Sequence, residues 1–216
     1  NIVSGEALAI TGSGTIVDKN VGSSKAVTLG TLALADNTAT ASNYSLNSAT
    51  LDVTQRALNI AATKAYDGNT TISASSVSLS NLVGGETLNK SGAITTNSTN
   101  VGSFGTSNIT VGSLSLADGT GTASNYTLSG GTHSATITQK TVGLSGSKVY
   151  DATSAANSSD LTLTGLVGSE TLTLSGSGTI ASSAVGTGKT ITLGSLAISN
   201  NGGLASNYNL SGLATM

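Results

Sequence analysis

Two sets of residues have the side-chain types that can form a covalent bond with one another. A self-forming Lys–Asn isopeptide bond requires a buried lysine amine, a nearby asparagine amide and a carboxyl group that shuttles protons. The two sets are Lys64, Glu86 and Asn125, and Lys148, Glu170 and Asn207. Residue types alone do not establish proximity. The isopeptide bond is therefore one hypothesis, and purely structural roles for these six residues are the alternative.

Other reactive groups are scarce in the sequence. The chain has no cysteine and a single histidine, His133, so transition-metal sites and nucleophile–base pairs are poorly supplied. His133 lies in a glycine-rich stretch, where we expect a surface loop. Asp36 and Asp118 lie in corresponding loops, but one carboxylate is far short of the roughly six to eight oxygens that Ca²⁺ takes. We expect solvated turns there, and we predict no catalytic site, no cofactor and no metal.

The composition also narrows the classes of partner. The net charge is −2 and only 8% of the residues are charged, which argues against a nucleic-acid partner because such a partner needs a basic surface. No apolar run of about 20 residues is present, so we expect no membrane insertion in this segment. Serine, threonine and glycine are abundant, but short alternating runs of valine, isoleucine and leucine argue against disorder.

The sequence contains an internal repeat, and the candidate residues recur at fixed positions within it. The words TASNYSL, TASNYTL and LASNYNL begin at residues 40, 122 and 204, so successive tyrosines are 82 residues apart (126 − 44 and 208 − 126). KAYDG at 64–68 returns as KVYDA at 148–152, an offset of 84 (148 − 64). A fixed interval predicts repeated structural units.

We divide the chain accordingly into three repeats. Repeat 1 (1–56) lacks its opening part, repeat 2 (57–140) is complete, and repeat 3 (141–216) lacks its last strand. The middle copy has two extra residues near Asn100–Asn108, where we expect a surface loop. Because the outer repeats are partial, we expect the chain to be an excerpt of a longer array.

All five tyrosines occupy two positions of the repeat. Tyr44, Tyr126 and Tyr208 share one position, and Tyr66 and Tyr150 share the other. We predict that these rings are buried, equivalent within each set, and are the large side chains of a core that otherwise consists of small residues. The tyrosine of the SNY word is expected to bond the backbone through its hydroxyl group, as in the tyrosine corner of sandwich domains.

Strand patterns recur along the chain, and no helical period is present. The pattern of Leu161–Gly176 predicts two strands joined by a Gly-Ser turn. Each repeat then holds roughly six to eight short strands, which is the number in a small sandwich. We predict an all-β chain of tandem small Ig-like β-sandwich domains arranged end to end. The alternatives are β-grasp-like units and a β-solenoid, although a solenoid coil usually takes about 20–50 residues.

Recurrent charged residues are predicted to have structural roles. Asp67 and Asp151 are expected to cap a turn by accepting N–H groups downstream. The recurrent glutamates are expected to pair with the lysines across strands, each pair stabilising the fold by at most about 1 kcal/mol. Ala152 stands where the first YDG word has glycine, which makes a left-handed backbone at that site less favourable.

Several words, in order, resemble the YDG repeat. They are KAYDGNTT (64–71), GGETLNKSG (84–92), NVGS (100–103), ASNYTL (123–128) and ATITQK (135–140). The resemblance is to the mostly-β, glycine-rich domains of large bacterial adhesins and of two-partner-secreted, filamentous-haemagglutinin-like exoproteins. The departures are Ala152 in place of the YDG glycine, and Gln55 and Gln139 where the family often has proline.

The resemblance implies a surface-exposed tandem stalk, and it leads to two competing functions. The first is a non-catalytic stalk or spacer of a cell-surface or secreted adhesin that supports cell adhesion or biofilm formation. Extracellular glycan or a host or matrix surface would then be bound through other parts of the parent protein. The second is a repeat that itself binds glycan or a partner protein. Buried tyrosines favour the stalk, whereas a row of exposed rings favours recognition.

Overall fold

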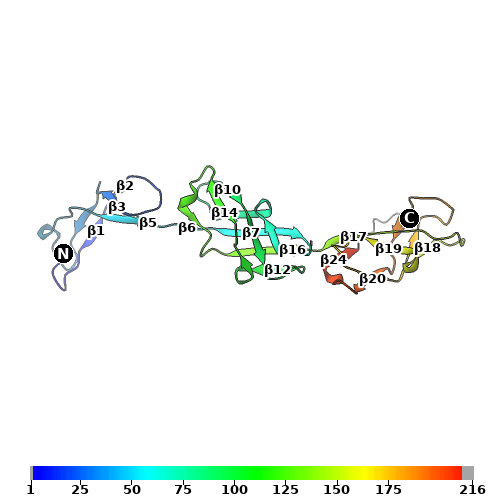
Figure 1. Ribbon diagram of the computed structural model, residues 1–216. Helices are drawn as coiled ribbons and strands as arrows, with labels where there is room; N and C mark the ends of the chain where they lie inside the picture. Colours follow the sequence, from blue (N-terminus) through cyan, green and yellow to red (C-terminus); the bar gives the residue numbers. More distant parts are fainter. Residues whose placement is uncertain (1, 211–216) are drawn as a thin grey trace. The chain divides into compact units, whose positions relative to one another are not determined.

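The structure is a computed structural model that describes residues 2–210 (Figure 1). Within these residues it consists of short β-strands and six three-residue 3₁₀ helices, without an α-helix. The prediction of an all-β chain is confirmed. No helix in this part of the chain is long and apolar enough to cross a membrane.

Short strands form because apolar and polar residues alternate, which places successive side chains on opposite faces of a sheet. Strand β7 (Asn59–Ala65) is an example: Ile60 and Ala62 are buried, whereas the alternating residues Ala61 and Thr63 are exposed. Strand β16 (His133–Thr138) follows the same alternation, with His133, Ala135 and Ile137 buried. Each such strand buries one face and leaves the other in contact with water.

The first part of the chain forms two small antiparallel sheets. Its strands are β1 (Ala9–Thr11), β2 (Thr15–Ile16), β3 (Gly22–Thr28), β4 (Ala33–Ala35) and β5 (Thr50–Val53), with helix η1 (Ala41–Asn43) before β5. Strand β1 pairs with β4, and β3 pairs with both β2 and β5. A register shift between Gly22 and Lys25 interrupts the β3–β5 ladder.

The middle part of the chain has the richest topology. Its strands are β6 (Arg56–Ala57), β7, β8 (Thr71–Ser73), β9 (Val77–Ser80), β10 (Leu88–Ser91), β11 (Ala93–Thr96), β12 (Gly102–Gly105), β13 (Ile109–Thr110), β14 (Ser115–Asp118), β15 (Tyr126–Thr127) and β16. Its helices are η2 (Ala74–Ser76), η3 (Thr106–Asn108) and η4 (Ala123–Asn125). The sheet orders are β12-β16-β7-β9, β13-β11-β8, β10-β14 and β15-β6. The predicted insertion loop falls on β12 and η3, so it is ordered secondary structure.

The last part of the chain repeats this arrangement with fewer strands. They are β17 (Lys140–Gly146), β18 (Ala155–Asn157), β19 (Leu161–Thr164), β20 (Leu172–Ser175), β21 (Ser177–Ile180), β22 (Ile191–Thr192), β23 (Ala197–Asn200) and β24 (Tyr208–Leu210), with helices η5 (Ser158–Asp160) and η6 (Ala205–Asn207). The sheet orders are β19-β17-β24, β18-β21-β22 and β20-β23. The predicted strands β19 and β20 exist, but they belong to different sheets and do not form a hairpin.

The Ig-like form of the predicted sandwich is not confirmed. Ig-like sandwiches contain antiparallel sheets, whereas β7 and β16, the first long strand and the last strand of repeat 2, run parallel side by side (Figure 1). Strands β17 and β24 also pair in parallel. Most other strand pairs of the described residues are antiparallel, and a solenoid of parallel coils would not contain them.

The compact units of the chain do not coincide with its sequence repeats. One unit comprises the residues up to 59 together with 81–89 and 116–131, and the other comprises 60–80, 90–115 and the residues from 132 onwards. Each unit therefore contains segments of two successive repeats. The second unit has two buried clusters, one around Leu144, Ile180 and Ile191 and one around Tyr66, Ile137 and Tyr208.

Candidate functional site: the junctions between repeats

The junction between repeats 2 and 3 lies within the second compact unit and is organised by Tyr208. Its ring is 2% exposed. Its hydroxyl group accepts a hydrogen bond from the Val167 N–H (3.0 Å) and donates one to Glu170 Oε2 (2.7 Å). The 3₁₀ helix η6 sets the direction of the ring, and the Asn200 side chain caps the helix by accepting the Ala205 N–H (2.8 Å). Repeat 3 thus holds its own glutamate and tyrosine in a fixed pair.

Repeat 2 contributes a second tyrosine to the same carboxylate. The Tyr66 hydroxyl group donates to Glu170 Oε1 at 2.5 Å, so both carboxylate oxygens accept a phenol. The rings of Tyr66 and Tyr208 meet edge to face, with centroids 5.4 Å apart and an interplanar angle of 80°. This geometry is a favourable one for aromatic pairs. Tyr66 is 4% exposed, so the phenol of repeat 2 is buried against repeat 3.

Asn207 makes the second polar link of this junction. Its Oδ1 accepts the Val101 N–H and its Nδ2 donates to Asn100 Oδ1, both at 2.9 Å. Gln139 Nε2 adds a bond to the Ser206 carbonyl oxygen at 3.1 Å. Asn207 is 1% exposed, and a buried amide requires such partners because an unpaired one is costly.

Two faces are defined by these contacts. We call Val167, Glu170, Asn207 and Tyr208 the docking face of repeat 3, and Tyr66, Asn100, Val101 and Gln139 the acceptor face of repeat 2. The docking face consists of the loop after β19 and the SNY word. The acceptor face consists of the YDG, NVG and TQK words. The recurring words of the sequence are therefore the words that join one repeat to the next.

The junction between repeats 1 and 2, within the first compact unit, has the same construction. Asn125 Oδ1 accepts the Val21 N–H (2.8 Å), and Asn125 Nδ2 donates to Asn20 Oδ1 (2.9 Å). The Tyr126 hydroxyl group accepts the Val83 N–H (3.1 Å) and donates to Glu86 Oε2 (2.6 Å). The docking face of repeat 2 is therefore Val83, Glu86, Asn125 and Tyr126.

The partner of the second carboxylate oxygen differs in this junction. Lys19 Nζ lies 2.8 Å from Glu86 Oε1, where Tyr66 bonds the equivalent glutamate of repeat 3. Gln55 Nε2 donates to the carbonyl oxygens of Ser124 and Tyr126, both at 3.1 Å. A cavity of about 270 Å³ remains beside Lys19, Glu86 and Tyr126. Lys19 thus replaces the phenol of Tyr66 as the donor to the glutamate, but it does not fill the space that the tyrosine ring occupies in the other junction.

The junctions also shift the pKa values of their groups. Burial, followed by the hydrogen bond to Glu170, raises the pKa of Tyr208 to about 12, and the same two causes raise the pKa of Tyr66. The hydrogen bonds from Lys19 and then Tyr126 lower the pKa of Glu86. Near neutral pH the phenols are therefore neutral donors, and the Glu86 carboxylate is a charged acceptor, which makes the Glu86 bonds charge-assisted.

A family comparison agrees with the repeated construction. The family model for the YDG domain matches residues 1–51, 53–135 and 132–215. The chain belongs to the YDG domain family. No curated protein and no solved structure matches it. Three YDG repeats therefore account for nearly the whole chain, and their mutual contacts are the main feature of the described residues.

The isopeptide sets are not assembled in these YDG repeats. Lys64 bonds Asp67, and Lys148 bonds Asp151. Glu86 and Glu170 instead bond tyrosines, and Asn125 and Asn207 bond the NVG or equivalent word of the preceding repeat. Within residues 2–210, no hydrogen bond or ion pair joins either lysine to the carboxylate or amide of its set.

The prediction that Tyr66 and Tyr150 are equivalent is wrong. Tyr66 is 4% exposed, whereas Tyr150 is 61% exposed. The reason is that Tyr66 is covered by the docking face of repeat 3, and nothing in the described residues covers Tyr150. For the SNY tyrosines, burial is confirmed for Tyr126 and Tyr208, while Tyr44 is half-buried. The predicted bond from the tyrosine hydroxyl group to the backbone is present in all three.

The backbone expectation for the YDG loop is also wrong. Ala152 has φ = 61°, close to the 76° of Gly68 at the equivalent position. The turn is retained because Asp151 accepts the Thr153 N–H, as Asp67 accepts the Asn69 N–H, both at 2.9 Å. The prediction that these aspartates cap the turn is confirmed. Alanine therefore adopts the left-handed region at an energetic cost that glycine does not have.

The remaining acidic residues have local roles. Asp36 and Asp118 accept the N–H groups of Ala41 and Ala123 at 2.6 and 2.7 Å, as Asn200 does for Ala205. An amide performs this cap as well as a carboxylate, which explains the change from aspartate to asparagine in the third repeat. The predicted cross-strand pairing of lysine and glutamate is wrong, because Lys64 and Lys148 bond the aspartates three residues later.

His133 lies in strand β16 and is 6% exposed, so the surface-loop prediction is wrong. Its N–H donates to Thr106 Oγ1 (2.8 Å), and the strand pairs in parallel with β7. Within residues 2–210, no group of three or more acidic, histidine or cysteine residues could hold a metal ion.

Proposed function

We propose that this chain is a stretch of structural stalk in a bacterial cell-surface or secreted adhesin. In this proposal its YDG repeats are non-catalytic spacers that support cell adhesion or biofilm formation from outside the cell. Binding to glycan, host or matrix surfaces would be performed by other parts of the parent protein. In this proposal the segment binds no nucleic acid and does not insert into a membrane.

The observation that carries the proposal is the bonding between successive repeats. Each junction has hydrogen bonds from one repeat to the SNY word and a glutamate of the next. They come from three words of repeat 2 at the junction with repeat 3, and from the segment Lys19–Val21 and Gln55 of repeat 1 at the junction with repeat 2. Flexible linkers without such contacts behave as random coils, whereas repeats that share an interface are stabilised by their neighbours. A spacer that keeps its length under load requires the second behaviour.

Tyrosine burial also favours a spacer over glycan recognition. Base or sugar stacking requires exposed rings, and Tyr66, Tyr126 and Tyr208 are each at most 4% exposed. Their hydroxyl groups are bonded to glutamates. These three tyrosine rings are therefore buried at the junctions and are not available to stack on sugar rings.

Small-angle X-ray scattering tests the proposal. The maximum dimension of the chain is compared with that of a longer chain in which residues 57–140 are duplicated. A stalk predicts a constant increase in length for each added repeat. A matched duplication that carries Tyr66→Ala and Gln139→Ala in both copies provides the flexible control. A folded-back particle whose length does not increase, or saturable glycan binding by the chain, would support the recognition function instead.

A further inference from the structure

The chain enters and leaves the fold of repeat 2 on two neighbouring parallel strands. Strand β7 is the first long strand of this repeat, and β16 is its last strand. They pair in a continuous parallel register that runs from Ile60 and His133 to Ala65 and Thr138. These paired residues belong to the second compact unit, and β7 and β16 are the two central strands of the sheet β12-β16-β7-β9 (Figure 1). The residues of repeat 2 between the two strands therefore lie in the segment that this pairing closes.

The parallel direction of the two strands determines how a pull along the chain loads them. The preceding repeat is joined to the amino-terminal end of β7, and the following repeat is joined to the carboxyl-terminal end of β16. In a parallel pair these two points lie at opposite ends of the ladder. A pull between them slides one strand along the other and strains all the hydrogen bonds of the ladder together. In an antiparallel pair the two points would lie at the same end, and the bonds would open one after another.

Hydrogen bonds reach both ends of the ladder. At the amino-terminal end the Ile60 N–H donates to the Thr132 carbonyl oxygen (3.2 Å), and at the carboxyl-terminal end the Tyr66 N–H donates to the Thr138 carbonyl oxygen (2.8 Å). Thr138 Oγ1 also donates to the Lys64 carbonyl oxygen (3.2 Å). The bonds thus extend to residues just outside the paired register, so neither end of the ladder is open.

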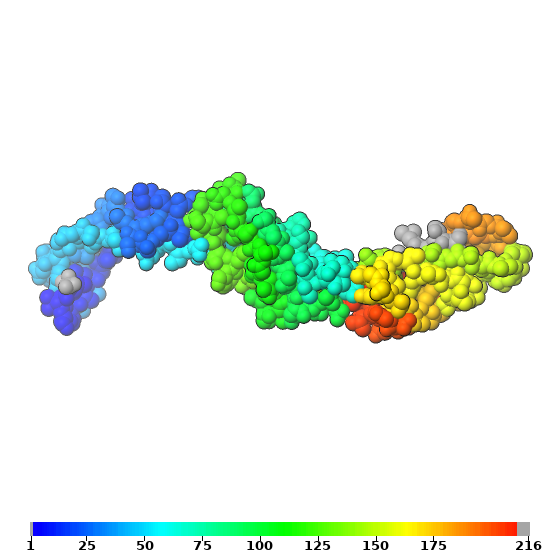
Figure 2. Space-filling model, viewed as in Figure 1, coloured from blue at the N-terminus to red at the C-terminus, as the bar shows by residue number. Residues whose placement is uncertain are grey.

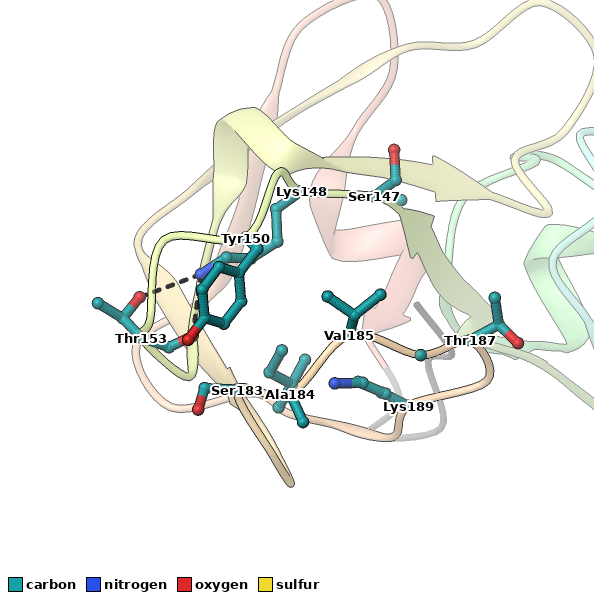
Figure 3. Close-up of a pocket in the computed structure, with 12 residues that line it drawn as sticks. Ser147, Lys148, Tyr150, Thr153, Ser183, Ala184, Val185, Thr187 and Lys189 are labelled. Atoms are coloured by element: carbon teal, nitrogen blue, oxygen red, sulfur yellow. Dashed lines mark hydrogen bonds between the residues drawn. The ribbon is translucent and has the colours of Figure 1, made fainter.

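The YDG turn fastens the end of β7 further. Lys64 Nζ lies 2.5 Å from Asp67 Oδ1 and donates to the Thr71 carbonyl oxygen (2.9 Å), so the turn that follows β7 is tied back to the strand. Repeat 3 has the same arrangement, and in Figure 3 dashed lines join Lys148 to Thr153 of its own turn. The recurring lysine therefore holds the strand and its turn together.

The docking face of repeat 3 joins the ends of the same two strands. Tyr66 directly follows β7, and Gln139 directly follows β16. Tyr66 bonds Glu170, and Gln139 bonds the Ser206 carbonyl oxygen. Figure 2 shows the two segments of the docking face side by side, the loop after β19 in yellow and the SNY word in red. The junction therefore links the carboxyl-terminal ends of β7 and β16 through one surface of the next repeat.

We propose that the β7–β16 ladder is a mechanical clamp that keeps repeat 2 folded when a pull acts along the chain. The clamp consists of the residue pairs from Ile60 and His133 to Ala65 and Thr138, and the residues between the two strands bear load only after it breaks. A load along the chain follows from the stalk function proposed above, so the biological role of the clamp rests on that proposal. The dependence of its strength on the direction of the pull rests on the ladder alone.

Single-molecule pulling on the full chain, with handles at different positions, tests the clamp. The chain has no cysteine, so an introduced pair of cysteines provides specific attachment points. The pair Ala61→Cys and Thr138→Cys pulls from opposite ends of the ladder, which is the shear direction. The pair Ala65→Cys and Thr138→Cys pulls on two residues that face each other and opens the ladder from one end. All three positions are exposed, and both pairs lose the same threonine hydroxyl group.

The two directions are expected to release the same length of chain at different forces. The handles are 77 and 73 residues apart (138 − 61 and 138 − 65), and an extended residue spans about 3.3–3.6 Å, so each rupture is expected to release about 25 nm. Forced unfolding is governed by the unfolding rate, and shear requires all the bonds to break together. The rupture force in shear is therefore expected to be at least about twice the opening force at the same loading rate.

A third pair, Ala61→Cys and Ser134→Cys, is the control, because these exposed residues face each other at the other end of the ladder. It is expected to give the low force as well, and urea denaturation is expected to give the same midpoint for all three pairs. Equal forces in shear and in opening overturn the proposal. So does a shear trace in which shorter lengths are released before the ladder breaks.

This outcome is distinguishable from a failure of the stalk proposal. Scattering measures whether each added repeat lengthens the particle without an applied load, whereas pulling measures the ratio of two forces within one repeat. Equal forces would remove the clamp and leave a constant length for each repeat unaffected. A folded-back particle would refute the stalk and leave the force ratio of the ladder unaffected.

Discussion

Replacing Tyr66 with phenylalanine separates the polar link between repeats 2 and 3 from their packing. Tyr66→Phe keeps the ring, its burial and its edge contact with Tyr208, and it removes only the hydroxyl group that lies 2.5 Å from Glu170 Oε1. Glu170 keeps its bond to Tyr208 within repeat 3. The substitution therefore tests the bond that crosses the junction.

The expected loss follows from the charge of the acceptor. A hydrogen bond to a charged group contributes about 1.5–3 kcal/mol to stability, so Tyr66→Phe is expected to reduce the free energy of unfolding by about 2 kcal/mol. With a urea m-value of about 1–3 kcal/mol/M, the midpoint of the transition falls by about 0.7–2 M. Far-UV circular dichroism in urea measures this shift.

Tyr150→Phe is the matched control, because Tyr150 occupies the same repeat position but is 61% exposed. Its effect is expected to stay within about 0.5 kcal/mol, as for other surface substitutions. If the two variants have the same midpoint, the Tyr66–Glu170 bond does not stabilise the junction. The argument from the crossing hydrogen bonds would then be refuted.

Three further predictions concern the same elements. Ala152→Gly is expected to stabilise the chain by about 1 kcal/mol, because it relieves a left-handed alanine, and urea denaturation measures the gain; a loss of stability would contradict the assigned backbone. Asn207→Ala leaves the Val101 N–H buried without its acceptor, so it is expected to lower the free energy of unfolding by about 1–3 kcal/mol and with it the melting temperature. The control Asn43→Ala, at an exposed position, is expected to change the melting temperature little. Because the pKa of Tyr208 is raised from 10.0 to about 12, the neutral phenol contributes stability that is complete below pH 10 and is lost as the pH rises from 10 to 12. Melting temperatures of Tyr208→Phe measured across this range should lack that part of the pH dependence.

The sequence predicts much of the architecture, because that information is local and periodic. The alternation of apolar and polar residues predicts the strands, and the recurrence of Asp67 and Asp151 after tyrosine predicts a capped turn. The pairing of strands is not local. Strands β19 and β20 are neighbours in the sequence but belong to different sheets, because the loop between them supplies Val167 and Glu170 to the junction instead of forming a tight hairpin turn.

The junctions were harder to predict because their residues come from distant words. Asn207 is 106 residues from the Val101 N–H that it accepts, and no local pattern of residues connects the two. A signal was nevertheless present: NVG occurs at residues 20–22 and 100–102, each time followed by an SNY word in the next repeat. Gln55 and Gln139 stand where a resemblance to the YDG repeat leads one to expect proline, and proline could not supply the side-chain amide that bonds the next repeat.

The recurrence of the junction words in each repeat has a consequence at the level of the gene. Each junction uses only residues of two adjacent repeats, and the SNY tyrosines are 82 residues apart both times (126 − 44 and 208 − 126). Recombination between the similar coding sequences of two repeats would delete or duplicate one repeat. The repeats that become neighbours would then present the same junction words to each other as the present neighbours do. The number of copies can therefore drift between lineages without a compensating substitution elsewhere in the chain.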